Sequence, residues 1–438
     1  MNKTIERLSS ALDEQAHSLA VLDGYYEGTQ PASFLSEKAR EALGKGFRNL
    51  GVNFPRLVVN SIAERLRVTG FRTPAGVDTG LWDLWNRYDL DEAAAQCHTE
   101  ALALGRCFVI VWADKDGNPV VTVESARQVA VQRDPATREV TAAFKRWVAD
   151  GKAHGVFFER DRITRVRSLG NTPSEGSIPA SGWETVEVLD NPLGVVPVVP
   201  FVNRGRITDL DGVSEMQDIL ALTDAVNKVS SDALVTSEYY ARPRRWATGL
   251  EVQEDDEGNP INPFQEGPDR VWQSEAPDTK FGQFAGSSLD GYGDLLATLT
   301  QQIGALAGLP PHYLGLNGDQ PPSADSIRSA EASLVATAFA RQRTFGAAWA
   351  RVAALVVAIR DGVDPLRVRV ETVWASPETR TPAQAADAAA KLREIGVPLA
   401  FILEHTLGFG PAEVEQVRAL ARAEALDSAG VDIEAILP

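Results

Sequence analysis

The feature that most constrains the fold is a continuous helical pattern of roughly 35 residues, which follows Ser323 and ends near Ile359. At 1.5 Å per residue such a helix spans on the order of 50 Å, whereas helices in globular proteins average about 11–12 residues. Alanine, valine, phenylalanine and tryptophan are spread over much of its circumference, so it needs neighbours on several sides. We therefore expect self-association, with this rod packed beside identical rods from sister chains.

The elements that precede this rod follow an unusual order. Apolar helices are expected from about Val213 to Ser237, with many small residues, and from Leu289 to Leu306. Between them lies a β-like insert, Tyr240–Phe284, and the loop Gly308–Ser323 leads into the long helix, for which Ser323 is the expected N-cap. The expected strands of the insert are Ala241–Leu250 and Arg270–Trp272.

The pattern before this region changes once, from helical to strand-like. Residues 1 to about 105 are expected to be mostly helical, with apolar faces at a spacing close to 3.6 residues. From Arg106 the period falls toward two, and tight turns such as Asp114–Asn118 predict an antiparallel meander. The expected strands are Cys107–Asp114, Asn118–Ser125, Gln128–Asp134, Arg138–Val148, Gly155–Ser168 and Trp183–Asp190.

Proline and glycine set the remaining expectations. Asn191–Arg204 contains three prolines, so it is predicted to be an extended edge segment and not a central strand. Asp361 and Gly362 end the long helix. A strand at Leu366–Val373, a helix at Pro382–Ile395 and a small helical tail are expected after them.

The bulk composition limits the class of protein. The chain has 438 residues, 44% of them hydrophobic, which is enough for about two to four domains. Its net charge of −17 argues against a general nucleic-acid-coating protein, although not against one that touches DNA without holding it. The two cysteines, Cys97 and Cys107, cannot form a disulfide framework and fit a reducing compartment. No secretory signal and no membrane-spanning segment is expected.

The sequence contains no recognisable catalytic or cofactor-binding motif. It lacks a Walker P-loop, a GxSxG elbow, an HExxH helix and a GxGxxG turn. The five histidines are too far apart for metal-ligand spacing, and Cys97 and His98 are interpreted as a buried thiol beside a surface imidazole. Asp255–Glu257 is interpreted as a solvated turn, because no EF-hand pattern surrounds it. We therefore expect no catalytic residue, no cofactor and no metal site.

One basic cluster carries candidate contact residues. Arg242, Arg244 and Arg245 lie at the start of the insert, beside Trp246. Phosphate contact is one interpretation of this cluster. Salt bridges between subunits, or to the acidic turn of the insert, are the other, and the sequence leaves both open.

The loop Gly308–Ser323 is the second candidate. It is long for a helix–helix connection, and loops of that length are commonly functional. Asp319 is the only residue of the loop with a formal charge, and His312, Tyr313 and Asn317 are polar. Prolines stiffen parts of the loop and glycines allow it to hinge.

The order and spacing of four stretches resemble the portal protein of long-tailed bacteriophages, in the branch typical of siphophages that infect actinobacteria. None of the four is a chemical signature by itself. Together they extend over nearly the whole chain, apart from a less distinctive C-terminus. The stretches are Asn53–Arg72, Gly194–Arg204, Asp211–Gly249 and Ile303–Leu334.

The resemblance implies an α+β fold, the portal fold, with a wing of helices and β-meander, a long-helix stem, a small α/β clip and a short helical crown. The shortness of the crown is the main departure from the family pattern. The implied parts are 1–105, the helical part of the wing; 106–210, its β part; 211–239 and 288–307, the stem helices; 240–287, the clip; 308–324, the tunnel loop; 325–362, a long kinked helix; 363–395, a return to the wing; and 396–438, the crown.

The resemblance also implies roles and partners. The family forms a homododecameric ring in the virion, assembled in the host cytoplasm, through which double-stranded DNA is packaged, retained and ejected. Implied partners are the terminase large subunit, a head-completion adaptor, and the major capsid and scaffold proteins, with no membrane. Arg242, Arg244, Arg245 and Trp246 fall in the docking clip, and Gly346 is the expected kink. The implied DNA-facing residues of the tunnel loop are Leu309, Pro310, Pro311, His312, Tyr313, Asn317, Asp319 and Gln320.

The acidic balance fits a conduit for DNA. Duplex DNA carries about one negative charge per 1.7 Å, so a basic channel would bind it and retard sliding. We expect a net negative lumen and a tunnel loop that contacts DNA mainly through uncharged groups. The alternatives are a minor head or scaffold protein, and a phage-particle enzyme whose site the sequence does not reveal.

Overall fold

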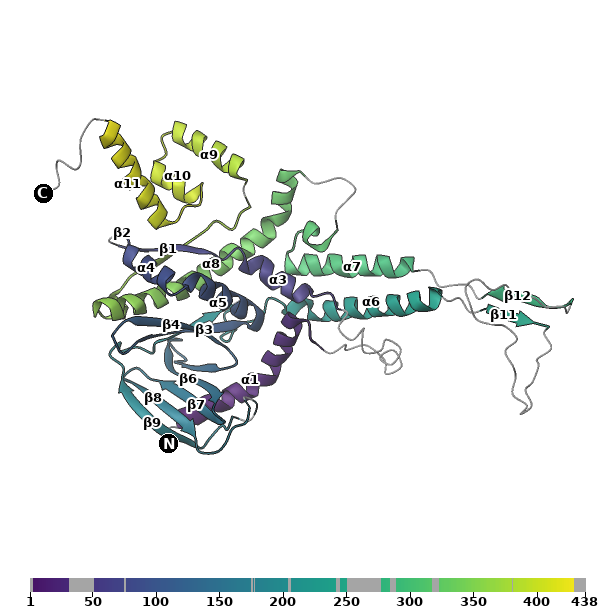
Figure 1. The fold of residues 1–438 in the computed structure, drawn as a ribbon, viewed down its shortest axis with the longest axis horizontal. Helices are drawn as coiled ribbons and strands as arrows, with labels where there is room; N and C mark the ends of the chain where they lie inside the picture. Colours follow the sequence, from purple (N-terminus) through teal and green to yellow (C-terminus); the bar gives the residue numbers. More distant parts are fainter. Residues whose placement is uncertain are drawn as a thin grey trace. The chain divides into compact units, whose positions relative to one another are not determined.

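The computed structural model forms two compact units (Figure 1). The first contains residues 1–31, 52–223 and 301–438, and the second contains 32–51 and 224–300. The residues that the structure describes are 3–30, 51–74, 76–174, 176, 178–203, 206–241, 245–249, 277–283, 289–316, 323–379 and 381–428.

The N-terminal part of the first unit is mainly helical, as predicted. Its helices are α1 (Lys3–Glu27), α3 (Phe54–Ala63), α4 (Thr79–Arg87) and α5 (Leu90–Leu104). Side chains start two of them: Asn53 accepts from the amide of Arg56 at 3.0 Å before α3, and Asp78 accepts from the amide of Leu81 at 2.9 Å before α4.

A small sheet between these helices was not predicted. Its strands are β1 (Val68–Thr73), β2 (Gly76–Val77) and β13 (Glu371–Trp374), in the order β13-β1-β2. β13 is antiparallel to β1 and is separated from it by most of the chain. The strand predicted at Leu366–Val373 is therefore wrong in its first half, where Asp364 caps the 3-10 turn Pro365–Arg367.

The predicted meander is antiparallel but divides into two sheets. One has the order β10-β3-β4 and the other the order β5-β6-β7-β8-β9. The segment predicted as one strand, Gly155–Ser168, forms a hairpin of two strands, because the amide of Glu159 bonds the carbonyl of Arg162 at 2.9 Å and turns the chain. The strands are β3 (Arg106–Ala113), β4 (Pro119–Ser125), β5 (Val129–Arg133), β6 (Val140–Ala149), β7 (Lys152–Phe158), β8 (Arg162–Ser168), β9 (Trp183–Asp190) and β10 (Val198–Val202).

Two local predictions in these sheets are confirmed. The Asp114 carboxylate accepts from the amides of Asp116 and Asn118 at 2.9 and 2.8 Å, which closes the turn between β3 and β4. β10 is an edge strand, and Pro200 lies within it opposite Phe108. An edge position tolerates proline because the missing amide is not needed by another strand.

The long helix α8 (Ala324–Asp361, 38 residues) begins and ends as predicted. Ser323 Oγ accepts from the amide of Ser326 at 3.2 Å, and Gly362 ends the helix with φ +66°. The prediction about its neighbours is wrong for the C-terminal half. From Ala348 to Ala358 nearly every side chain is buried within the same chain, with residues of α4, β4 and β10 around it, because this half fills the core of the first unit.

Aromatic rings make the centre of that core. Trp349 is fully buried, and its ring meets those of Trp85 and Phe201 edge to face at centroid distances of 5.0 and 4.8 Å. Phe201 comes from the edge strand β10 and Trp85 from α4, so one side chain of α8 joins the helical layer to the sheet. Figure 1 shows α8 running between these layers.

A separate core lies between α1 and the five-stranded sheet. Ile5 and Leu8 of α1 pack against Phe144, Phe157 and Trp183. Ser9 Oγ, which also lies on α1, accepts from a guanidinium of the sheet at 2.7 Å; the donor is Arg146. The predicted apolar stripe of the first helix is thus confirmed as a face that covers the sheet.

The C-terminal helices of the first unit are α9 (Pro382–Glu394), α10 (Leu399–His405) and α11 (Pro411–Ser428). Thr381 and Gln384 form a capping box at the start of α9. A Cβ on Gly70 would lie 2.8 Å from the ring of Pro411, so a glycine is required where α11 meets β1.

The described part of the second unit consists of most of α6 (Leu220–Ala241), the start of α7 (Asp290–Ala307) and the hairpin β11 (Arg245–Thr248) and β12 (Lys280–Gln283). α6 starts later than predicted, because Gln217–Ile219 forms a 3-10 turn before it. The two helices touch through the hydroxyls of Thr236 and Tyr292, which are 3.1 Å apart.

Candidate functional site

The first half of the predicted tunnel loop folds back onto helices. We call residues 308–316 the loop root. Gly308 has φ +65°, a 3-10 turn covers Pro311–Leu314, and Gly315 has φ +69°. Leu309 is only 6% exposed, and a Cβ on Gly304 of α7 would lie 2.4 Å from the side chain of Leu314. The root is therefore packed tightly on the end of α7.

A polar cluster fastens the root to two other elements. The guanidinium of Arg65, in the turn after α3, donates to the hydroxyl of Tyr313 at 3.1 Å and to Oε1 of Glu331 at 3.2 Å. Glu331 lies on α8, and Nε2 of His312 is 3.8 Å from the same carboxylate oxygen. Residues that are far apart in the sequence thus meet at one ion pair.

This ion pair is almost removed from solvent. The side chains of Arg65 and Glu331 are 11% and 5% exposed. Gln342, about three turns further along the same stripe of α8, donates to the carbonyls of Arg65 and Ala375, both at 3.0 Å, and so holds the turn after α3 in place. Within the described part of the chain, Arg65 Nε and Glu331 Oε2 are buried without a hydrogen-bond partner.

The helices α6 and α7 of the second unit leave apolar side chains exposed. Leu234 is 38% exposed and Leu295 is 46% exposed, and few side chains of α7 are buried. These helices also carry little positive charge. α7 contains no lysine or arginine, and Lys228 of α6 is paired with Asp232.

The hairpin β11–β12 contains part of the predicted clip cluster. Trp246 is 38% exposed, and its ring covers Gly282, where a Cβ would lie 2.5 Å from the indole. Arg245 begins β11 opposite Gln283. Arg242 and Arg244, and the acidic turn Asp255–Glu257, lie outside the described residues.

The described residues contain no cluster of potential metal ligands. Nowhere among them do three or more His, Cys, Asp or Glu side chains gather as metal ligands. Cys97 and Cys107 are buried free thiols, and burial, with Cys107 nearby, raises the pKa of Cys97. The surface imidazole predicted at His98 is wrong: His98 is fully buried, because α5 is covered by α8 on that side and Trp349 donates to its ring.

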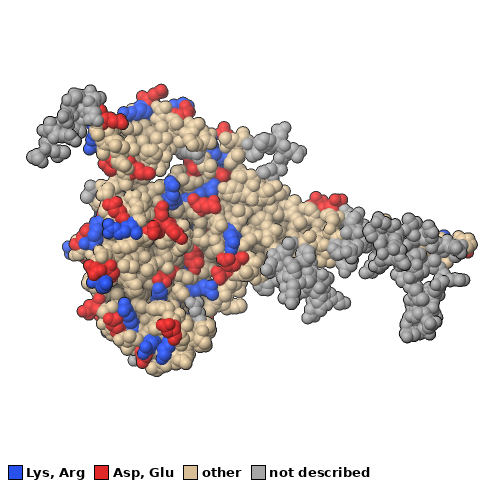
Figure 2. Space-filling view, viewed as in Figure 1, with Lys and Arg blue, Asp and Glu red and all other residues tan. Residues whose placement is uncertain are grey.

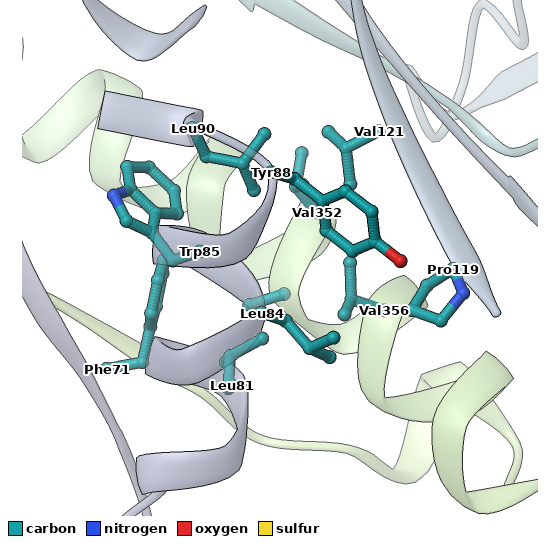
Figure 3. A pocket seen from close by; sticks show the side chains of 11 residues that line it. Phe71, Leu81, Leu84, Trp85, Tyr88, Leu90, Pro119, Val121, Val352 and Val356 are labelled. Carbon is teal, nitrogen blue, oxygen red and sulfur yellow. The ribbon is translucent and has the colours of Figure 1, made fainter. Parts of the chain in front are cut away.

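The apolar pocket in Figure 3 is a small gap in the packing of the core and not a ligand site. It lies between α4, β4 and α8, and the rings and methyl groups of Leu84, Tyr88, Val121 and Val356 converge on it. Its volume of about 10 Å³ is close to the smallest that holds one water molecule. Figure 2 shows acidic and basic side chains interspersed over the visible face of the described residues.

The structure separates the predicted loop residues into three groups. Leu309 and Pro310 are buried, so in this conformation they offer little surface to DNA. Pro311, His312 and Tyr313 form the 3-10 turn of the root and keep part of their surface exposed. Asn317, Asp319 and Gln320 lie outside the described residues.

The expected kink residue has a clear packing role. α8 remains helical through Gly346, and a Cβ there would lie 2.9 Å from Nε1 of Trp374 on β13. The carbonyl of Gly346 accepts from the hydroxyl of Thr372 at 3.0 Å. The glycine thus allows β13 to approach the helix, and its role as a kink stays a prediction.

The sequence reasoning missed Arg65, Glu331 and Gln342. The side chain of Arg65 is nearly buried, although it lies in a turn after α3. A signal was present in α8, where Glu331 and Gln342 occupy the same stripe as Leu334, Ala338 and Phe345, at spacings of three and four. Charged and amide side chains on an apolar stripe require partners, which points to a buried polar cluster.

The chain belongs to the family described as phage portal protein, SPP1 Gp6-like, whose model matches residues 5–423. It is therefore a phage portal protein. The chain is 30% identical to a portal protein of Mycobacterium phage L5 over 88% of its length and 81% of the relative's. It is also 30% identical to a portal protein of Mycobacterium phage D29, over 97% of its length and 90% of the relative's. The resemblance found in the sequence is thereby confirmed.

Solved structures with similar folds come from gene transfer agent particles. One is described as the virion of a native gene transfer agent particle, with 15% identity, a TM-score of 0.48, and coverage of 86% of this chain and 94% of that chain. Another is described as the neck of an empty particle of the same kind, with 15% identity, a TM-score of 0.49, and coverage of 82% and 90%. None of the helices in the described ranges is long and apolar enough to cross a membrane.

Proposed function

We propose that this portal protein forms a closed, dodecameric ring around a DNA channel at one vertex of the capsid. The genome would enter through the channel during packaging, be retained by it, and leave through it on ejection. The proposal rests on membership of the portal family and on the helix–hairpin–helix order of α6, β11, β12 and α7. Closed rings arise when two different faces of one chain pair with each other repeatedly.

The single observation that carries the ring is the exposure of leucines on α6 and α7. Leu234 of α6 is 38% exposed and Leu295 of α7 is 46% exposed, so both helices of the second unit carry apolar surface. Apolar groups gathered on exposed helices mark sites of association. In a ring these stem helices would lie beside the equivalent helices of sister chains. The C-terminal half of α8 needs no such neighbour, since its own chain covers it.

Substitution of the leucines tests the ring. Leu234→Glu with Leu295→Glu should convert the assembly to monomers, because each charge would have to be desolvated at every interface. The matched control is Leu366→Glu, at a leucine of the first unit that is 73% exposed. Particle mass would be measured by native mass spectrometry. Intact rings from the double variant would refute the assignment of these helices to the interface.

The charge of the helices supports a channel through which DNA slides. Lys228 is the basic residue of α6, and the acidic residues of the two helices are Asp224, Asp232, Glu238, Asp290 and Asp294. Few cations mean few phosphate contacts that would have to break as the duplex advances. Asp319→Lys in the tunnel loop should slow translocation or alter retention in a packaging assay. Unaltered packaging and retention would weaken the loop assignment.

The hairpin β11–β12 is the proposed docking element. The terminase large subunit would bind there during packaging, and the head-completion adaptor would bind there afterwards. ATP hydrolysis would belong to the terminase, and this chain would have no enzymatic step of its own. The wing and crown would contact the major capsid and scaffold proteins during assembly in the host cytoplasm. Among the residues that the structure describes, no observation favours a minor head protein, a scaffold protein or an enzyme.

A further inference from the structure

We infer that Arg65 and Glu331 are positioning residues for the tunnel loop: their buried ion pair, together with Tyr313, holds the loop root on α3 and α8. We call Arg65, Tyr313 and Glu331 the root latch. The inference deepens the proposed function, because it names the side chains that fix where the DNA-facing loop leaves the protein.

The latch joins three elements of the first unit. Arg65 follows α3, Glu331 lies in the second turn of α8, and Tyr313 lies in the root between α7 and α8. One terminal nitrogen of Arg65 contacts both the Tyr313 hydroxyl and Glu331 Oε1, at 3.1 and 3.2 Å. The guanidinium also lies over the Tyr313 ring, 6.0 Å from its centroid. The root cannot move away from Arg65 without breaking both contacts of Tyr313, while Glu331 holds the guanidinium in position for them.

The environment makes the latch depend on both charges. With side chains 11% and 5% exposed, neither ion is solvated while the root is seated. Removal of one partner leaves the other as an uncompensated buried charge, which is more destabilising than loss of the pair. The unpartnered atoms Arg65 Nε and Glu331 Oε2 act in the opposite direction, because each would regain hydrogen bonds with water if the root lifted.

Backbone and side-chain packing explain how the latch acts on the loop. The amide of Leu309 bonds the carbonyl of Gly304, and the amide of Leu316 bonds the carbonyl of Pro311, at 2.9 and 3.1 Å. A Cβ on Gly308 would lie 2.7 Å from Ser333 Oγ of α8. The root is therefore a compact turn, and fixing Tyr313 fixes the points at which the loop enters and leaves it.

The test is hydrogen–deuterium exchange of the 308–316 peptide in the full chain, without DNA. Glu331→Gln should speed exchange at least tenfold, and Tyr313→Phe roughly fivefold, the loss of about one hydrogen bond. The matched control is Glu215→Gln, which breaks the Arg341–Glu215 pair, an ion pair of α8 with side chains 16% and 15% exposed that does not touch the root. It should leave exchange in this peptide as in the parent.

A second variant covers the case in which Glu331→Gln fails to fold. Arg65→Met with Glu331→Leu replaces the pair by apolar groups, which commonly preserves stability. We expect a folded protein whose root still exchanges faster than in the parent. Parental exchange in this double variant, or equal acceleration in Glu215→Gln, would overturn the inference.

A packaging assay separates this inference from the proposed function. Faster root exchange with reduced packaging or retention by intact rings supports both. Faster root exchange with unchanged packaging would support the root latch but refute the DNA-facing role of the loop.

Discussion

Nε1 of Trp349 donates a 2.8 Å hydrogen bond to Nε2 of His98, and both side chains are fully buried where α8 lies against α5. The donation requires Nε2 to be unprotonated, so the imidazole is neutral. The ring of His98 also stacks on Phe345, with centroids 5.5 Å apart. Burial lowers the pKa of His98 to about 3. This contact is central to the core of the first unit.

The first prediction concerns the pH dependence of stability. The unfolded chain binds a proton on His98 near pH 6.5 and the folded chain only near pH 3, so acid favours the unfolded state between these values. The free energy of unfolding should therefore lose about 1.6 kcal/mol from this residue between pH 6.5 and 5. Urea unfolding of His98→Asn should show a shallower slope in this window.

The control for that experiment is His17→Gln, at an exposed histidine of α1, which should keep the parental slope. Equal slopes for the parent and His98→Asn would contradict the account.

The second prediction concerns Gly346. In Gly346→Ala the new methyl group would lie 2.9 Å from Nε1 of Trp374, so the indole must shift. We expect a loss of about 1–3 kcal/mol in the free energy of unfolding, typical of overpacking. Gly293→Ala in α7 is the control, because its Cβ would meet nothing within 4 Å, and helix propensity alone should make it neutral or slightly stabilising. A stable Gly346→Ala would show that close approach is not why glycine occupies this position.

The third prediction separates two roles of Asp78. Its carboxylate caps α4 and accepts two hydrogen bonds from Arg360 at 3.1 and 3.0 Å. Asp78→Asn keeps a good capping side chain and should cost under about 1 kcal/mol, whereas Asp78→Ala also loses the cap and should cost about 1–2 kcal/mol. Thermal unfolding of both variants would measure the difference. Equal losses would mean that the ion pair, and not the cap, is the main contribution.

The fourth prediction concerns docking. Gly282→Val would place a side chain where the Cβ alone lies 2.5 Å from the Trp246 ring, so the hairpin should lose its packing. Rings should still form, because the exposed leucines of the stem helices are untouched, but binding of the terminase large subunit should fall at least tenfold. Surface plasmon resonance on purified rings would measure it. Parental affinity would remove the hairpin from the docking surface.

The sequence predicted helices and strands well where the residues that determine them lie within the element or next to it. Helix α8 follows from its apolar pattern, from Ser323 and from Gly362, all of which lie within or beside it. The edge position of β10 follows from Pro200. Pairing between distant segments could not be predicted in this way. β13 lies beside β1 because tertiary packing brings the two strands together, and the spacing of apolar residues within each strand does not identify its partner.

The candidate site shows the same limit. The proline-rich loop could be identified from composition, but its root is held by Arg65, which comes from a turn about 250 residues earlier in the chain; the Arg65–Tyr313 separation is 248. The long rod was expected to be apolar because of sister chains. Its C-terminal half is apolar because it is the core helix of its own chain, and periodicity does not distinguish these two origins.

The most direct test of the central claim is electron microscopy of the purified protein, with its mass measured in solution. The account predicts a closed ring of sister chains around a central hole, with the leucines of α6 and α7 between neighbours. A globular monomer or dimer at every concentration, with no hole, would contradict it.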